Sequence, residues 1–157
     1  PALHRKGRAV TEARLAPLGW RLVADEVVPH ELGALTEALT RLAGRADMTL
    51  ILTGSATSDP QDVGPEAVRR AGGAIARFGM PVDPGNLLFI GRLSDRPVVG
   101  LPGCARSPAR NGADLVLERL AAGLSVGDAE IARMGVGGLL KEIPVRPQPR
   151  EGRATEN

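Results

Sequence analysis

A three-layer α/β/α fold around a mostly parallel sheet is predicted by the length of this chain and by two patterns along it. The 157 residues suit one domain, and folding at that size buries roughly 68–70% of the surface of the unfolded chain. Short apolar runs alternate with segments whose apolar residues recur every three or four positions. Such alternation is typical of βαβ units, in which helices cover a parallel sheet.

The first half of the chain predicts two helices and two strands. Residues 10–18 read as a helix that Gly19 ends, and residues 21–24 as a short strand. Residues 31–43 form the second helix, because four leucines share one face: Leu32, Leu35, Leu39 and Leu42. The continuous apolar run 48–52 predicts the most buried strand, covered on both faces.

The second half alternates more regularly. A helix over 65–71 begins with a proline, which suits the first helical position, and an amphipathic helix covers 113–122. A tight turn is expected at 94–96. Three further strands are predicted, at 74–78, 87–91 and 97–101.

Composition narrows the classes of function. Cys104 is the only cysteine, which excludes an internal disulfide framework and a multi-cysteine zinc site. No apolar run reaches the roughly 20 residues of a membrane helix, and no signal-peptide pattern opens the chain. The net charge is +2, without a basic stripe carrying stacking aromatics. We therefore expect a cytoplasmic protein with neither a membrane nor a nucleic-acid partner.

The loop after the buried strand is the first candidate site. Ligands of open parallel sheets bind at the carboxyl ends of strands, and a following helix N-terminus offers unpaired N–H groups to phosphate. A glycine lets the backbone approach the ligand, and neighbouring hydroxyls can bind phosphate. The candidate substrate-binding residues here are Thr53, Gly54, Ser55, Thr57 and Ser58.

Two carboxylates follow in the same loop. Asp59 and Asp62, three residues apart, could hold Mg²⁺, and either could accept a proton. The alternative is that one of them only caps the next helix.

Two Pro-Gly turns supply the remaining candidates. Alone, each is only a turn at a strand edge, and a single cysteine is more often an inert small residue than a nucleophile. The candidate residues are Pro84, Gly85, Asn86, Pro102, Gly103, Cys104 and Ser107.

Together the three loops resemble the molybdopterin-binding fold shared by molybdopterin adenylyltransferases, molybdopterin molybdenumtransferases and gephyrin. The family's Thr-Gly-Gly-x-Ser/Thr loop, which ends in Asp, is matched at four positions: Thr53, Gly54, Thr57 and Asp62. Its Pro-Gly-Lys turn is matched by Pro84–Gly85, and its Leu-Pro-Gly-Asn turn by Leu101–Gly103. The resemblance spans about residues 9–124.

Three longer segments resemble a bacterial group in which such a domain precedes a cytidylyltransferase-like domain: 79–88, 100–111 and 134–142. This resemblance implies a molybdopterin-binding domain over 9–143, followed by a Pro/Arg-rich linker or disordered tail over 144–157. Domains of the family open with a strand, whereas this chain starts at its first helix, so the domain could lack that strand.

The resemblance implies a ligand and roles for these residues. The chain would bind molybdopterin or its adenylylated form during molybdenum cofactor biosynthesis, with Asp62 as the catalytic carboxylate near Mg²⁺ and the transferred group. All three loops would line one cleft. An active enzyme would be a molybdopterin nucleotidyltransferase or a molybdenumtransferase-like transferase. Expected partners are a pterin phosphate, a nucleotide, a fused or neighbouring nucleotidyltransferase domain and further copies of the chain.

Three departures from the family pattern support a second hypothesis. Ser55 replaces a glycine, Asn86 a lysine and Cys104 an asparagine. Loss of the lysine removes a charge-assisted hydrogen bond of roughly 1.5–3 kcal/mol, although Arg106 or Arg110 could replace the charge. The second hypothesis, from another class, is therefore a non-catalytic scaffold domain of a larger cofactor-processing nucleotidyltransferase, which Asn86 and Cys104 favour. A third hypothesis is a generic phosphometabolite-binding α/β domain.

Overall fold

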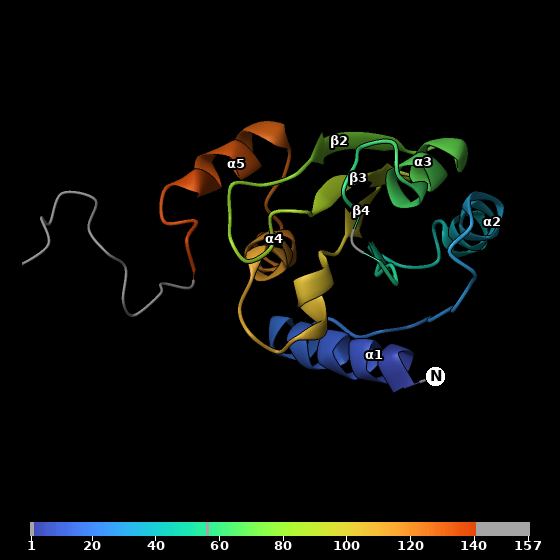
Figure 1. The fold of residues 1–157 in the computed structure, drawn as a ribbon, viewed down its shortest axis with the longest axis horizontal. Helices are drawn as coiled ribbons and strands as arrows, with labels where there is room; N and C mark the ends of the chain where they lie inside the picture. Colours follow the sequence, from blue (N-terminus) through green and yellow to red (C-terminus); the bar gives the residue numbers. More distant parts are fainter. Residues whose placement is uncertain (1, 56, 141–157) are drawn as a thin grey trace, which may run out of the picture.

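A four-stranded sheet with helices on both faces forms the centre of the molecule (Figure 1). The computed structural model describes residues 2–55 and 57–140. The strand order is β1-β4-β3-β2. The strands are β1 (Thr49–Ile51), β2 (Ala74–Phe78), β3 (Phe89–Leu93) and β4 (Arg96–Gly100). The predicted α/β class is confirmed.

The sheet is mixed, so the prediction of a mostly parallel sheet is wrong. β1 pairs parallel with β4, whereas β3 pairs antiparallel with both β2 and β4. The cause lies in the turn between β3 and β4, where Ser94 and Asp95 both have positive φ, at 50° and 59°. A two-residue turn of this kind joins antiparallel neighbours, because parallel neighbours need a crossover of a dozen or more residues.

Helices and short 3₁₀ turns fill the connections. The helices are α1 (Ala2–Leu15), α2 (Leu32–Leu42), α3 (Val63–Arg70), α4 (Gly112–Ala121) and α5 (Asp128–Ala132). The 3₁₀ turns are η1 (Ala16–Leu18), η2 (Gly103–Arg106) and η3 (Arg133–Gly135). Most elements lie within two residues of their predicted bounds. The exceptions are α1, which begins well before residue 10, and α5, which the sequence pattern does not predict.

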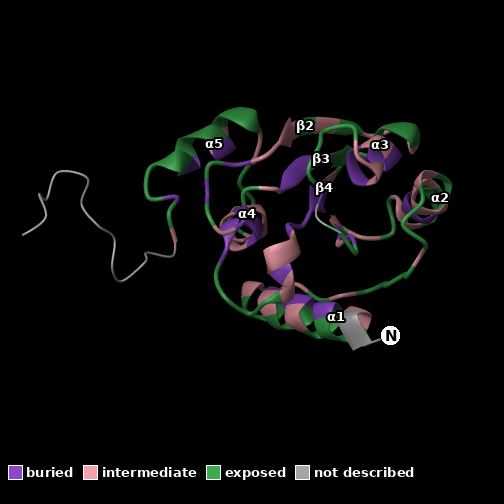
Figure 2. Cartoon of the chain, in the orientation of Figure 1, coloured by how far each residue is buried: buried purple, intermediate pink, exposed green. Residues whose placement is uncertain are grey.

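Two apolar clusters make up the core, one on each face of the sheet. Neighbouring residues of β3 point to opposite faces, as in any strand, so Ile90 joins one cluster and Phe89 the other. The Ile90 cluster includes residues of α4 and α5, and the Phe89 cluster includes residues of α2 and α3. Buried residues accordingly gather on the central strands and on the inner sides of these helices (Figure 2). Helices thus pack on both faces, and a full three-layer order remains a prediction.

The region before β1 differs most from the prediction. Residues 21–24 form no strand; they belong to an extended coil that runs from η1 to α2 (Figure 1). β1 is an edge strand rather than the most buried strand, and Thr49 and Leu50 are only half-buried. Within the described ranges, no strand pairs with the outer edge of β1. Residues 21–24 have the composition of a strand but no neighbour with which to pair.

The predicted tail at 144–157 lies outside the described residues. Across the part of the chain that the structure covers, every helix is too short or too polar to cross a membrane.

Candidate functional site

The first loop, Thr53–Asp62, leaves the carboxyl end of β1 and leads into α3, as predicted. Two of its hydroxyls face inward. The buried Thr53 donates to the carbonyl oxygen of Ser55 and lies 3.4 Å from the hydroxyl of the buried Thr57. Gly54, Ser55 and Ser58 are exposed. The threonines therefore hold the loop closed, and the exposed residues are the ones that a ligand can reach.

Both carboxylates of this loop bind its own backbone. Oδ2 of Asp62 accepts from the amides of Ser58 (2.7 Å) and Asp59 (3.1 Å), and Oδ1 of Asp59 accepts from the amide of Gln61 (2.7 Å). These amide donors hold the pKa of the Asp62 carboxyl below its usual value. Asp62 is the N-cap residue of α3, yet its side chain makes no capping bond to the helix. The carboxylates thus order the loop rather than cap α3.

Metal binding has little geometric support here. Within residues 2–55 and 57–140, no group of three or more His, Cys, Asp or Glu side chains is placed to hold a metal ion.

The third loop follows β4 and contains η2. A guanidinium from α1 holds it: Nη1 of Arg14 donates to the carbonyl oxygen of Ala105 (2.8 Å), and Nη2 donates to those of Ser107 (3.0 Å) and Ala109 (3.2 Å). Nε of Arg14 lies 2.6 Å from the carboxylate of Asp114, on α4. The Arg14 side chain is 7% exposed. One buried cation therefore joins α1, the loop and α4.

Cys104 lies within this turn as a half-buried free thiol. Burial raises the pKa of the thiol above its usual value. Because the thiolate is the nucleophilic form, this shift disfavours a nucleophilic role and agrees with a small packing residue.

The second loop, Pro84–Asn86, packs against the start of α4. The carbonyl oxygen of Pro84 accepts from the amide of Gly112 (2.8 Å), and a Cβ on Gly85 would lie 2.3 Å from that same nitrogen. Asn86 lines a pocket of about 360 Å³ whose far side is formed by Gly135, Gly138 and other residues that follow α5.

The other two loops meet at a different and larger cleft of about 980 Å³. We call it the β1 cleft, because it lies along β1 between α1 and α2. Thr53 and Gly54 line it together with Leu101 and Arg106, the residues that flank the third turn. The expectation that all three loops line one cleft is therefore wrong: the third turn reaches the β1 cleft through its flanks, and the second loop lines the smaller pocket.

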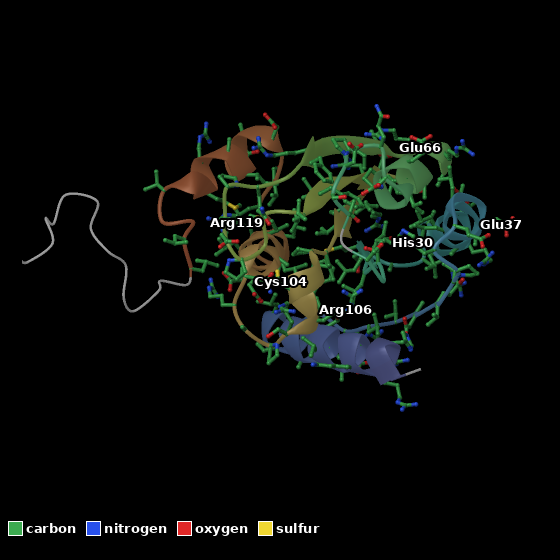
Figure 3. All side chains as sticks on the ribbon, in the orientation of Figure 1. His30, Glu37, Glu66, Cys104, Arg106 and Arg119 are labelled. Carbon is green, nitrogen blue, oxygen red and sulfur yellow. The ribbon has the colours of Figure 1, made fainter. Side chains whose placement is uncertain are left out.

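The β1 cleft has an apolar floor and a polar mouth. Floor residues come from α2, β1 and the coil before α2: Trp20, Leu22, Leu35, Leu39, Leu42, Met48 and Leu50. Charged side chains also line the walls and the opposite end of the cleft, namely His4, Arg8, Asp25, Glu26, Arg45 and Asp47. The carboxyl end of β1 is polar too. There His30, before α2, and Arg106, on η2, flank the cleft from opposite sides (Figure 3). This end can take an anionic group while the floor takes an apolar one.

Arg14 and Arg106 were not among the predicted site residues. Arginine is common on the surface of this chain. Spacing along the sequence does not show which residues either of these two arginines contacts. The structure also distinguishes between Arg106 and Arg110, the two arginines that could replace the charge of the family's lysine. Arg110 binds Glu118 through both terminal nitrogens (2.6 and 2.9 Å), whereas Arg106 lines the cleft.

Comparison with known proteins identifies the family. The model of the family described as "Probable molybdopterin binding domain" matches residues 6–122, about three quarters of the chain. No curated protein and no solved structure gives a significant match. The matched range begins in α1, includes β1 to β4 and ends just after α4. Both loops that border the β1 cleft lie within it, and this chain belongs to the molybdopterin-binding domain family.

Proposed function

We propose that this domain binds molybdopterin, or its adenylylated form, in the β1 cleft during molybdenum cofactor biosynthesis. One observation carries the proposal: in a chain of this family, the Thr53 loop and the Arg106 turn meet at the polar end of a cleft of about 980 Å³. Ligand pockets typically have volumes of about 300–1,000 Å³. The terminal phosphate would lie at the mouth beside Gly54, and the apolar floor would accept the pterin.

A calorimetric titration of the purified chain with molybdopterin and with AMP tests this proposal. Gly54→Leu is the informative variant, because a Cβ at Gly54 meets nothing within 4 Å and its φ is not in the left-handed region. The leucine should fill the mouth and reduce molybdopterin binding without disturbing the fold. Gly33→Leu is the matched control, since Gly33 has the same free space on the exposed side of α2, outside the cleft lining. Unmodified protein that binds no molybdopterin would refute the function.

Whether the domain also transfers a nucleotide or molybdenum is a separate part of the proposal. We propose Asp62 as the acidic residue of that chemistry, with Mg²⁺ held by Asp59 and Asp62 as a further possibility to test. Asp62→Asn should abolish transfer and leave molybdopterin affinity unchanged or slightly higher, because the amide oxygen can still accept from Ser58 and Asp59 while one negative charge near the phosphate is removed. Transfer that survives in Asp62→Asn would exclude this role.

The second candidate is a scaffold that keeps the fold and has lost the chemistry. It is favoured by Asn86, which lines the smaller pocket in place of the family's lysine, and by Cys104, whose raised pKa keeps it a thiol. In this case the unmodified protein binds molybdopterin but transfers nothing, with or without Mg²⁺. A fused or neighbouring nucleotidyltransferase domain, a cytoplasmic location and assembly with further copies belong to the same proposal.

We also propose that the molybdopterin-binding domain extends from residue 9 to residue 143.

A further inference from the structure

Arg106 places an uncommitted guanidinium at the mouth of the β1 cleft. It ends η2, and it lines the cleft together with Leu101, Thr53 and Gly54. The side chain is half-buried, and it forms no hydrogen bond or ion pair with any residue that the structure describes. A partly desolvated cation without a partner attracts an anion more strongly than a fully hydrated one.

Other arginines near the cleft are paired, exposed or lie elsewhere. Arg21 lines the cleft from the coil after η1, but it is exposed, whereas Arg106 is half-buried. Arg110, in the same loop as Arg106, is held by Glu118. Arg8 also lines the cleft, but it pairs with Glu12 and Asp25. Arg45 lies before β1, at the end of the strand opposite Thr53.

We propose that Arg106 contacts the phosphate of the ligand in the β1 cleft and that Arg14 is the positioning residue that presents it. This inference rests on the proposed function and names the residue that recognises the charged end of the ligand. A guanidinium suits this task because its planar fork can bind two phosphate oxygens at once.

Arg14 fixes the turn that carries Arg106. Its terminal nitrogens hold the carbonyl oxygens of Ala105 and Ser107, the residues on either side of Arg106. Its Nε binds Asp114, which in turn accepts from the amide of Asn111 and so anchors the clamp to the first turn of α4. The backbone around Arg106 is thus tied to α1 and α4. A lysine at position 14 could keep the ion pair with Asp114, but its single ammonium cannot span all three carbonyls.

The test titrates inorganic phosphate and molybdopterin into the unmodified chain, Arg106→Gln, Arg110→Gln and Arg45→Gln. Arg106→Gln should weaken both ligands at least about tenfold, the loss expected when a charge-assisted hydrogen bond is removed. Arg110→Gln should bind like the unmodified protein, since its guanidinium serves Glu118. Arg45→Gln should also bind inorganic phosphate normally, because Arg45 lies at the end of the cleft opposite Arg106. Equal affinity of Arg106→Gln and unmodified protein would overturn the assignment.

Arg14→Lys separates positioning from stability. Its melting temperature should fall, because the lysine leaves some of the three carbonyl oxygens without a donor. Measured at a temperature where the variant is still folded, its phosphate affinity should fall toward that of Arg106→Gln. A folded Arg14→Lys protein with full affinity would exclude the positioning role. If this variant does not fold, ¹⁵N spectra of the arginine side chains in unmodified protein decide. Phosphate should shift the Arg106 signal and leave that of Arg14 in place; the reverse pattern would exclude the proposal.

The two ligands distinguish the failure of this inference from failure of the function. Phosphate binding that depends on Arg106, without molybdopterin binding, would leave the anion site intact and refute the pterin ligand. Molybdopterin binding that does not depend on Arg106 would support the proposed function and refute the role of Arg106. Absence of both kinds of binding would refute both proposals.

Discussion

At the residue scale, two charged side chains hold the loops that border the β1 cleft, and both act through backbone groups. Arg14 donates to three carbonyl oxygens of the third loop, and Asp62 accepts from two amides of the first. Charge-assisted hydrogen bonds are stronger than neutral ones. They therefore hold both loops in place, although neither loop contains much regular secondary structure. The shape of the cleft mouth therefore depends on ionisation as well as on packing.

The Asp62 carboxyl gives a prediction for pH dependence. Because amide donors lower its pKa in the folded chain, the ionised form stabilises the loop fully above the ordinary value of 3.8. That stabilisation is lost as the pH falls through the lowered pKa. A ¹³C NMR titration should give a midpoint below 3.8 for Asp62, and protection of the Ser58 and Asp59 amides should fall over the same range. The pH dependence should be absent in Asp62→Asn. A midpoint at or above 3.8 would contradict the hydrogen bonds described.

At the element scale, the ring of Phe89 determines how β4 and α3 approach β3. The ring is buried between two glycines: a Cβ on Gly100, its partner across the ladder, would lie 1.9 Å from a ring carbon, and one on Gly64 would lie 3.2 Å away. Since β4 is central and paired on both sides, its backbone cannot move away from the ring. The absence of side chains at these two positions lets one large residue fill this face of the sheet.

Gly100→Ala should therefore destabilise the domain by about 1–3 kcal/mol, the usual cost of overpacking a core. Gly54→Ala is the matched control, because Gly54 also follows the carboxyl end of a strand but faces open space. Its effect should stay within about 0.5 kcal/mol. Urea unfolding of the two variants measures both values. Equal stability of the two variants would mean that the Phe89 ring moves aside without cost.

At the scale of the whole molecule, the sheet ends at an unpaired edge beside a cleft. The coil before α2 runs along the cleft, and two adjacent acidic residues tie it to opposite walls. Asp25 pairs with His4 and Arg8 on α1, and Glu26 pairs with Arg41 on α2. Its Val23 and Val27 are largely exposed, at 55% and 68%. An edge strand with free N–H and C=O groups is a template for pairing with one more strand.

An added strand should therefore stabilise the fold. Five apolar β-branched residues, joined to the start of α1 by a short turn, can reach the edge of β1, because α1 passes close to the strand's end: a Cβ on Gly7 would lie 2.9 Å from Leu52. The melting temperature should rise by about 4 °C or more, which corresponds to one or two kcal/mol at this size. A control extension of equal length, with proline and aspartate in place of two apolar residues, should have no effect. Equal melting temperatures for both extensions would mean that the edge of β1 does not accept a strand. A strand that does pair there would occupy part of the β1 cleft and should therefore weaken ligand binding.

The sequence by itself determined the α/β class, nearly all element bounds and the family. Each of these depends on local or short-range patterns: apolar spacing in α2 and α4, turn residues at Ser94–Asp95, and motif order in the loops. The same turn requires β3 and β4 to pair antiparallel, since two residues cannot span a parallel crossover. The length of this turn in the sequence was therefore enough to predict the relative direction of these two strands.

Tertiary structure alone decided which loops meet. The order of the motifs predicted that the three loops line one cleft. In the structure, the Pro84–Asn86 turn lies against α4 and faces another pocket. It also decided that Thr57 faces inward and that Arg106, not Arg110, reaches the cleft. These outcomes depend on contacts between residues some 50 to 100 positions apart, such as Arg14 with Asp114. Spacing along the chain carries no information on such contacts, because they depend on how the helices pack against the sheet and against one another.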